Sequence, residues 1–276
     1  MRSILILGST GMAGHMIFNH LDRLRKYKLY NISYRSKLNN STIICDVTNQ
    51  AELESILFKL RADVVINCIG VLLKGSKEDA KNAIYINSYL PQLLSVKVNE
   101  YGGKLIHLST DCVFSGKKGG YLETDFRDAD DLYGRSKALG EIINKTDLTI
   151  RTSIIGPELK KNGEGLFNWI MRQNGQISGF TRVYWSGITT CELSKFIEFA
   201  ILNDLTGLVH ATNNQKINKY DLIKLIIDIY SLKKISLIPN SEKVADKSLI
   251  NSRSDFNYLF PTYKQMIEQL LNVQNK

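Results

Sequence analysis

The sequence predicts an α/β protein with a doubly wound parallel sheet, followed by a small C-terminal α/β lobe. Short apolar runs alternate with helical patterns through the first half of the chain, which is typical of parallel strands joined by helices. The first apolar run ends in a glycine-rich loop, and the alternation loosens after residue 153. The 276 residues suffice for one large domain with a smaller appendage.

Composition narrows the class of protein. Hydrophobic residues make up 43% and charged residues 23%, as in ordinary soluble proteins. No apolar run could cross a bilayer, and the first residues resemble a strand rather than a signal peptide, so we expect a cytoplasmic protein without a membrane partner. The net charge of +9 is not concentrated in an arginine-rich tract, so we expect no nucleic-acid partner. The four cysteines lack metal-binding spacing and are expected to be reduced thiols.

The first strand is predicted at Ser3 to Leu7, directly before a glycine loop. The loop reads Gly8-Ser9-Thr10-Gly11-Met12-Ala13-Gly14, and a helical pattern follows it as far as Leu24. In this context glycines allow a tight turn and let the backbone approach a pyrophosphate at the helix N-terminus. The loop therefore predicts a Rossmann-type dinucleotide site, with contacts from Gly8, Thr10, Gly11, Met12 and Gly14.

The second strand, near Leu29 to Tyr34, bears on the choice of cofactor. NAD-binding proteins usually place an acidic residue at the end of this strand, on the adenosine ribose. Here the residues are Arg35 and Lys37, which could hold a 2′-phosphate. We therefore expect NADPH, with NADH as the alternative, although Arg35 could equally be a solvated loop residue.

Two further strands should bring residues to the same sheet edge. Strands are predicted at Thr42 to Cys45 and Asp63 to Gly70, separated by a helix at Gln50 to Leu60. Asp46 either meets the adenine amine or is an acid at a helix N-terminus. The stretch Cys68-Ile69-Gly70 should contact the cofactor, because the carboxyl ends of parallel strands line the ligand crevice.

A long helix and a fifth strand follow. The helix is predicted from about Asp79 to Tyr101, and Asn87 lies on its apolar stripe. Asn87 is either a satisfied buried amide or a group that fixes the active-site backbone. The strand Lys104 to Leu108 should deliver Ser109 and Thr110 to the edge that holds the glycine loop.

Three residues form a candidate acid/base set. Tyr133 and Lys137 are four positions apart on a predicted helix that runs to about Lys145, so they share a face. A nearby ammonium favours the phenolate, so we expect Lys137 to lower the Tyr133 pKa and make Tyr133 a proton donor to a carbonyl. Thr110 would hold the same carbonyl oxygen.

The remainder of the chain is expected to form the smaller lobe. A sixth strand is predicted at Leu148 to Ser153, so residues 1–153 form an NAD(P)-binding domain and 154–276 a mainly substrate-binding lobe that is partly interleaved with it. Aromatic side chains such as Trp185 could stack on a base or a sugar, or simply pack. The other elements expected here are helices at Leu166 to Arg172, Cys191 to Leu202, Lys219 to Tyr230 and Thr262 to Leu271, and strands at Leu208 to Ala211 and Ile235 to Ile238.

The motifs together resemble the extended short-chain dehydrogenase/reductases, and more narrowly the dTDP-4-dehydrorhamnose reductase family. The resemblance rests on the glycine loop, Ser109-Thr110-Asp111-Cys112-Val113-Phe114-Ser115-Gly116, Tyr133-Gly134-Arg135-Ser136-Lys137 with Gly140-Glu141, and Ile150-Arg151-Thr152-Ser153. It implies that Thr110, Tyr133 and Lys137 are catalytic. It also implies that NADPH reduces the 4-keto group of a nucleotide-linked 6-deoxyhexose, in the synthesis of O-antigen or capsule precursors.

The resemblance extends to the contacts that we expect. Further cofactor contacts are expected from Val47, Asn87, Ser109, Lys137 and Ser153. Substrate contacts are expected from Val71, Asp111, Cys112, Phe167 and Trp185. The partner is then a nucleotide-diphosphate sugar, and the protein a monomer or homodimer.

Two departures from the family pattern matter. Cys112 stands where the family usually has Tyr, and where the related dehydratases have the Glu that performs elimination, which argues against dehydration. The first helix lacks the Glu that some members use for a metal-linked dimer contact, so we expect no metal. Asn67-Cys68-Ile69-Gly70, Asp130-Asp131-Leu132-Tyr133 and Ser186-Gly187-Ile188-Thr189-Thr190 resemble a branch acting on UDP-linked 2-acetamido-2,6-dideoxy-4-ketohexoses.

Two other functions stay open at this point. A nucleotide-sugar 4-epimerase would use the same three residues but keep a tightly bound NAD, against which Arg35 and Lys37 argue. A non-catalytic dinucleotide-binding regulatory protein would need the glycine loop but not Thr110, Tyr133 and Lys137 together.

Overall fold

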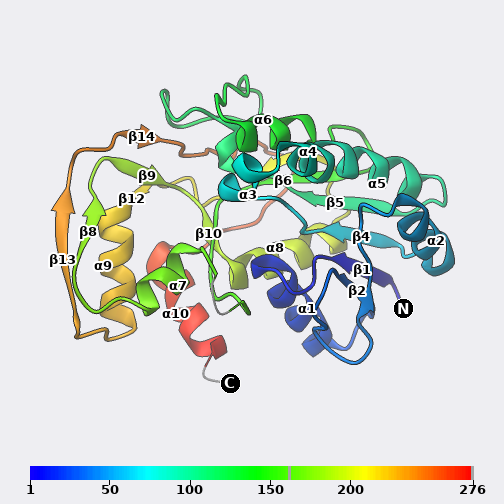
Figure 1. Ribbon diagram of the computed structural model, residues 1–276, viewed down its shortest axis with the longest axis horizontal. Coiled ribbons are helices and arrows are strands. Elements are labelled where there is room, and N and C mark those ends of the chain that lie inside the picture. The colour runs from blue at the N-terminus through cyan, green and yellow to red at the C-terminus, as the bar shows by residue number, and fades with distance from the viewer. Residues whose placement is uncertain (161–162, 275–276) are drawn as a thin grey trace.

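A seven-stranded parallel sheet forms the centre of the computed structural model, which describes residues 1–160 and 163–274 (Figure 1). The strand order is β11-β6-β5-β4-β1-β2-β3, and every neighbouring pair is parallel. The strands are β1 (Ser3–Leu7), β2 (Lys28–Ser33), β3 (Ile43–Ile44), β4 (Val64–Asn67), β5 (Lys104–Leu108), β6 (Leu148–Arg151) and β11 (Gly207–His210). The predicted fold class is confirmed.

Helices cover both faces of this sheet. Along β1, Ile4 and Ile6 belong to the core beneath α1 (Met12–Leu24) and α8 (Thr190–Leu202). Leu5 and Leu7 belong to a second core beneath α2 (Gln50–Leu60) and α5 (Leu90–Asn99). Because successive side chains point to opposite faces and both faces are covered, the central strands consist of continuous apolar runs.

The predicted long helix is divided into shorter segments. It consists of α3 (Leu73–Glu78), α4 (Ala80–Ile84), a π-helical turn η1 (Tyr85–Tyr89) and α5. Pro91 has no N–H to donate to the carbonyl of Asn87, and the N–H of Leu90 reaches back five residues to Tyr85 instead. The π turn directs Asn87 and Ser88 at α6 (Leu132–Leu139), where Ser88 Oγ donates to Ser136 O at 2.7 Å.

Helix α6 also ends earlier than the sequence predicts. It stops at Leu139 rather than near Lys145, with Gly140 as its C-cap. The next residue, Glu141, turns into the protein and pairs with Arg151 of β6 at 2.7 Å. A long-range ion pair, which local periodicity does not record, therefore ends the helix.

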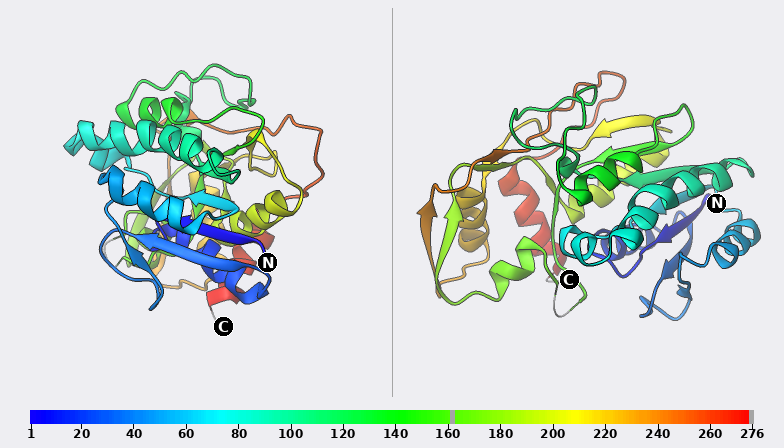
Figure 2. Two further views of the ribbon diagram at one scale, coloured as in Figure 1. Left: turned by 90° about the vertical axis from the view of Figure 1, so that its right-hand side faces the viewer. Right: turned by 45° about the horizontal axis from the view of Figure 1, so that its top comes forward.

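The C-terminal lobe lies beside the sheet, on the left in Figure 1 and in the right-hand view of Figure 2. Its helices are α7 (Leu166–Met171), α9 (Lys219–Ile229) and α10 (Tyr263–Gln274), close to the predicted positions. Its small sheets pair β8 (Gly175–Phe180) with β13 (Ile235–Asn240), β9 (Val183–Trp185) with β12 (Ile217–Asn218) and β14 (Ala245–Asp246), and β7 (Ile154–Ile155) with β10 (Ile188–Thr189). Most of these strands were not predicted.

The chain returns to the main sheet after it has begun the lobe. Helix α8 packs against α1, and β11 pairs with β6, although both follow residue 153. Residues after 153 therefore contribute one strand and one covering helix to the main sheet unit. In the part of the chain that the structure describes, no helix is both long and apolar enough to span a membrane.

Candidate active site

A cavity of about 400 Å³ opens at the carboxyl edge of the main sheet. The glycine loop, the ends of β4, β5 and β6, and helix α6 all contribute to its wall. Of the residues predicted for the site, those that line it are Thr10, Gly11, Met12, Cys68, Ile69, Gly70, Ser109, Thr110, Asp111, Cys112, Tyr133, Lys137 and Ser153. The fold therefore brings the glycine loop and the acid/base set together.

The glycine loop is shaped for a close backbone approach. Gly8 has a φ of +79°, and a Cβ on Gly14 would lie 2.2 Å from the carbonyl oxygen of Gly8. These two positions therefore require glycine for α1 to pack against the end of β1. Gly11 precedes α1 without a side-chain cap, and the first turn of α1 holds no acidic residue. The N-terminus of α1 thus suits a phosphate.

Thr110 follows β5 and starts a short helical turn. Its Oγ1 accepts a hydrogen bond from the N–H of Cys112 at 3.1 Å and donates one to Asp111 Oδ1 at 3.1 Å. The backbone before it is held by β6, because Ser109 N donates to Ile150 O at 2.8 Å. Thr110 is therefore placed by the sheet as well as by its own turn, η2 (Asp111–Val113).

Helix α6 presents Tyr133 to Thr110. Asp131 caps the helix by accepting the N–H of Gly134 at 2.8 Å. A Cβ on Gly134 would lie 2.2 Å from the carbonyl oxygen of Cys112, so only glycine lets the helix approach η2 this closely. The Tyr133 phenol then interacts with the Thr110 hydroxyl.

The Tyr133 pKa differs from the sequence-based expectation. Removal of the phenol from water raises its pKa, the neighbouring Cys112 adds to the rise, and the Thr110 hydrogen bond opposes it. The expected lowering by Lys137 is wrong for this arrangement, because the Lys137 ammonium donates instead to the carbonyl oxygen of Leu108 at 2.6 Å. Tyr133 is thus a neutral phenol with a firmly held proton.

Lys137 is buried, with 4% of its surface exposed. Burial lowers its pKa to about 8, and the negative charge of Glu141 only partly opposes this effect. A lysine whose pKa lies this close to neutrality can both hold and release a proton.

A buried polar network behind the cavity was not anticipated from the sequence. Both oxygens of Glu141 receive Arg151 nitrogens, at 2.7 and 2.8 Å, and Ser109 Oγ donates to the same carboxylate at 2.7 Å. Arg127 adds a bond at 3.0 Å, and Arg151 contacts His210 Nε2 at 3.1 Å. The network ties β5, β6, β11 and the end of α6 together beneath Thr110. The signal was present in the Gly140-Glu141 and Ile150-Arg151 motifs, but nothing local indicated that they pair.

Asn87 combines the two roles left open by its sequence position. Its side chain accepts the N–H of Val71 and donates to the carbonyl oxygen of Val71, both at 2.9 Å, and it donates to Ser136 Oγ at 3.1 Å. It is a satisfied buried amide that fixes the backbone beside Gly70 to α6. Its expected cofactor contact, like that of Val71 with substrate, stays a prediction.

The residues predicted to contact adenosine lie outside this cavity. Arg35 is exposed, and its guanidinium stacks 4.6 Å from the Tyr34 ring. Asp46 accepts bonds from Thr48 N at 3.0 Å and Thr48 Oγ1 at 2.7 Å, in the turn before α2. Val47 is buried beside that turn. Asp46 is thus an acid of the turn that precedes a helix, and its contact with the adenine amine stays a prediction.

Two aromatic residues predicted to contact substrate lie in the core. Phe167 is 3% exposed and packs edge-on against Tyr230, with ring centroids 5.3 Å apart. Trp185 is 4% exposed and packs against Tyr263 at 5.5 Å. Neither lines the cavity. Their contacts with substrate stay predictions, and the residues that line the cavity do not support them.

The lobe brings two lysines near Asp111, which lines the cavity. Asp111 is buried, which raises its pKa, and the ammonium groups of Lys219 and Lys247 oppose that rise. Lys219, the first residue of α9, also lies over the Trp185 ring at 5.4 Å. No spacing in the sequence marked either lysine, because they meet Asp111 only through the fold.

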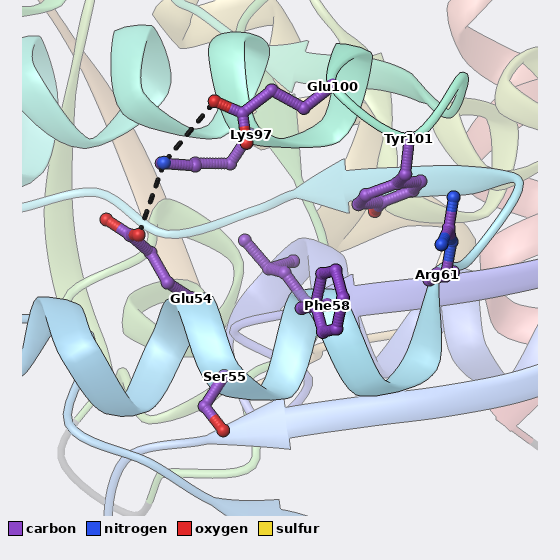
Figure 3. Close-up of a pocket in the computed structure, with 8 residues that line it drawn as sticks. Glu54, Ser55, Phe58, Arg61, Lys97, Glu100 and Tyr101 are labelled. Carbon is purple, nitrogen blue, oxygen red and sulfur yellow. Dashed lines mark hydrogen bonds and ion pairs between the residues drawn. The ribbon is translucent and has the colours of Figure 1, made fainter.

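A second cavity, of about 590 Å³, lies between α2 and α5 (Figure 3). Lys97 reaches Glu54 and Glu100, each at 3.3 Å, and Arg61 lies 5.9 Å from the rings of both Phe58 and Tyr101. None of the predicted site residues lines this cavity. Its greater volume therefore does not make it the active-site candidate.

Comparison with known proteins identifies the family. The model of the family described as RmlD substrate binding domain matches residues 1–253. The chain belongs to this family. The match spans the main sheet, the cavity and most of the C-terminal lobe, and it confirms the family resemblance seen in the motifs.

Individual relatives agree with this assignment. A dTDP-4-dehydrorhamnose reductase from Aggregatibacter actinomycetemcomitans is 26% identical over 243 residues, covering 83% of this chain and 79% of the relative. Among solved structures, a dTDP-4-dehydrorhamnose reductase from Bacillus anthracis in complex with NADP has a TM-score of 0.85 at 22% identity, covering 99% and 100% of the two chains. A UDP-glucose 4-epimerase from Thermotoga maritima has a TM-score of 0.80 at 15% identity, covering 99% and 100%. The two structures establish a shared fold.

Proposed function

We propose that this protein is an NADPH-dependent reductase of the 4-keto group of a nucleotide-activated 6-deoxyhexose. The observation that carries the proposal is that Thr110, Tyr133 and Lys137 line one cavity with the glycine loop. An acid/base set beside the end of a bound dinucleotide is the geometric condition for carbonyl reduction, and the shared cavity supports the proposal on this ground. Family membership and the reductase relatives support the same reaction class.

The residues present fit a dinucleotide. Gly8, Gly11 and Gly14 let the loop backbone approach a pyrophosphate closely, and the N-terminus of α1 has no side-chain cap. Arg35, exposed after β2, would hold the 2′-phosphate that distinguishes NADPH from NADH. When bound, NADPH supplies the hydride.

Tyr133 and Thr110 would handle the carbonyl oxygen. The raised pKa of Tyr133 keeps its proton in place until the oxygen becomes an alkoxide, which is basic enough to take it. When its hydroxyl proton turns from Asp111 Oδ1 to that oxygen, Thr110 adds a hydrogen bond beside that of Tyr133, which orients the oxygen and stabilises the developing charge. Lys137 would hold the nicotinamide ribose beside Tyr133.

The substrate would enter from the side of the lobe. Lys219 and Lys247 place positive charge near Asp111, where they suit the diphosphate of a nucleotide sugar. The motifs favour a UDP-linked 2-acetamido-2,6-dideoxy-4-ketohexose over the dTDP-linked sugar. We expect the enzyme to act in the cytoplasm, as a monomer or homodimer, in the synthesis of cell-surface polysaccharide precursors.

The decisive experiment follows NADPH consumption with two enzymatically generated 4-keto-6-deoxy sugars. One is dTDP-linked, and the other is UDP-linked with a 2-acetamido group. We expect oxidation with the UDP-linked sugar; oxidation with the dTDP-linked sugar alone would keep the reductase and reject the proposed branch. Tight NADPH binding without oxidation of either would contradict the proposal, and co-purified NAD⁺ would then point to an epimerase.

A further inference from the structure

Lys137 has an unusual neighbour behind the active site. Its Nζ donates to Leu108 O at 2.6 Å, and the next nitrogen, His107 Nε2, lies 3.4 Å away. His107 belongs to β5 and has no exposed surface. Burial and the nearby Lys137 hold the pKa of His107 well below its usual value, so its ring is neutral and carries one proton.

The sheet sets the partner on the other side of the ring. Asn67 of β4 is the register partner of His107, so the two side chains lie on the same face of the sheet. Asn67 Nδ2 lies 3.1 Å from His107 Nδ1, and Asn67 Oδ1 accepts the backbone N–H of Ile69 at 3.1 Å. Asn67 is also completely buried.

This chain of contacts determines which ring nitrogen carries the proton. The N–H of Ile69 can only donate, so the Asn67 atom that faces it must be the oxygen. The amide nitrogen then faces His107 and donates to Nδ1, which must be unprotonated. If the amide were flipped, its NH₂ group would face the N–H of Ile69, and two donors would meet. If Nδ1 carried the proton, that N–H would face the NH₂ group of Asn67, and again two donors would meet. The proton of His107 is therefore on Nε2 and faces Lys137.

An N–H that faces Lys137 discriminates between the two forms of its amine. An ammonium group has only donors and cannot accept this bond, whereas the neutral amine has a lone pair that can. We propose that Asn67 and His107 are positioning residues that stabilise the neutral form of Lys137, so that Lys137 can return a proton to Tyr133 during turnover. The role in turnover rests on the proposed reductase function.

The proton movement balances without a further reactant. Tyr133 gives its proton to the substrate oxygen and becomes a phenolate. Water in the cavity that both residues line relays the proton: a water O–H gives its proton to the phenolate, and the Nζ–H bond of Lys137 breaks to restore that water. The neutral amine then accepts the Nε2–H of His107 until water in the open cavity reprotonates it.

The other groups around Lys137 do not replace His107. The Cys68 thiol follows β4, and burial raises its pKa to about 12, so it stays neutral. Glu141, beyond the end of α6, favours the ammonium, but its carboxylate is already engaged by Arg151, Arg127 and Ser109. Tyr133 on α6 is a neutral phenol because burial raises its pKa. The lowered pKa of Lys137, about 8, agrees with a site that favours the amine.

The first test reads the tautomer directly and needs no turnover. Nitrogen NMR of the protein with labelled histidine side chains distinguishes a protonated from an unprotonated ring nitrogen. We expect His107 to carry its proton on Nε2. A proton on Nδ1 would overturn the proposal, whatever the substrate of the enzyme is.

The second test follows the titration of Lys137 by NMR of labelled lysine in the unmutated protein and in His107→Leu. Loss of one hydrogen bond to the amine should raise the midpoint from about 8 by roughly one pH unit. His20→Leu is the matched control, because His20 pairs with Glu198 on the α1–α8 side of the sheet. If His107→Leu folds and the midpoint does not move, the proposal is wrong.

The kinetic readout connects the titration to turnover. In the unmutated enzyme, the pH profile of kcat should change near the Lys137 midpoint, and His107→Leu should shift that change upward by the same amount. A purely structural role would lower kcat without moving the profile. If NADPH is not oxidised at all, the reductase proposal fails, but both NMR results still stand on their own.

Discussion

The sheet unit and the C-terminal lobe place functional side chains in different ways. In the sheet unit, Thr110 and Lys137 follow from strand ends and helical spacing, and their positions are recorded in short motifs. In the lobe, Lys219 and Lys247 approach Asp111 from α9 and from the segment after β14, which no local pattern connects. The residues of the proposed reaction are thus encoded in local motifs, whereas the proposed sugar contacts depend on how distant segments assemble.

The two regions also differ in how they hold charge. Glu141 and Arg151 are fully buried and paired in two places. Lys219 has no carboxylate within ion-pair distance among the residues that the structure describes, although Asp111 lies near enough to affect its pKa. A buried and fully paired ion pair supports the fold, whereas a half-buried cation without an ion-pair partner suits an anionic ligand.

The largest effect should come from the acid in the sheet unit. Tyr133→Phe removes the proton donor and should lower kcat by about 10²–10⁴-fold, because general acid catalysis contributes on that order. NADPH affinity, measured by fluorescence titration, should change little. Unchanged turnover in a folded variant would remove Tyr133 from the proposed mechanism.

The buried ion pair should dominate the stability of the same unit. Glu141→Gln leaves the Arg151 guanidinium buried without its carboxylate and should reduce the free energy of unfolding by about 3–5 kcal/mol. Urea unfolding measures the loss. Glu54→Gln, in the partly exposed ion pair between α2 and Lys97, is the matched control and should change the midpoint little. Equal urea midpoints for the two variants would show that the Glu141 network does not stabilise the carboxyl edge of the sheet.

The same pair predicts a pH dependence. Although burial alone would raise it, the Arg151 hydrogen bonds and charge hold the pKa of Glu141 below its usual value. The contribution to stability is therefore complete above the unfolded-state pKa of about 4.3 and is lost as the pH falls through the lower folded-state value. In acid, the stability difference between the unmutated protein and Glu141→Gln should shrink.

A smaller effect should distinguish the cofactors. Arg35→Ala removes a charge-assisted contact to the 2′-phosphate and should raise KM for NADPH by about 10–100-fold. KM for NADH, which lacks this phosphate, is the internal control and should stay the same. Equal KM changes for both cofactors would mean that Arg35 supports the loop rather than the phosphate.

The smallest effect should separate the lobe from the sheet unit. Lys219→Met should raise KM for the nucleotide sugar by about tenfold and leave KM for NADPH unchanged, because only the sugar carries its diphosphate to this end of the cavity. Lys216→Met, in the same lobe but paired with Asp246 at 2.6 Å, is the matched control. If Lys219→Met instead changed KM for NADPH, the lobe would not be reserved for the nucleotide sugar, and the distinction between the two regions would be wrong.

The sequence by itself determined most strands of the main sheet, the glycine loop and the spacing of the candidate acid/base residues. Continuous apolar runs predicted β1, β4 and β5, because a strand that is covered on both faces needs apolar side chains at nearly every position. The Tyr133 and Lys137 spacing was readable because a helix repeats over a few residues. Each of these signals lies within one element or one turn, where the chain itself sets the geometry.

The tertiary structure alone decided the charges and the partners. Burial, rather than Lys137, sets the Tyr133 pKa, and the pairing of β4 with β5 places Asn67 beside His107. Phe167 looked like a substrate contact and lies in the core, whereas Lys219 had no signal and lies near Asp111. Desolvation and Coulomb interactions depend on which distant segments pack together. Neither produces a periodic pattern of residues in the sequence.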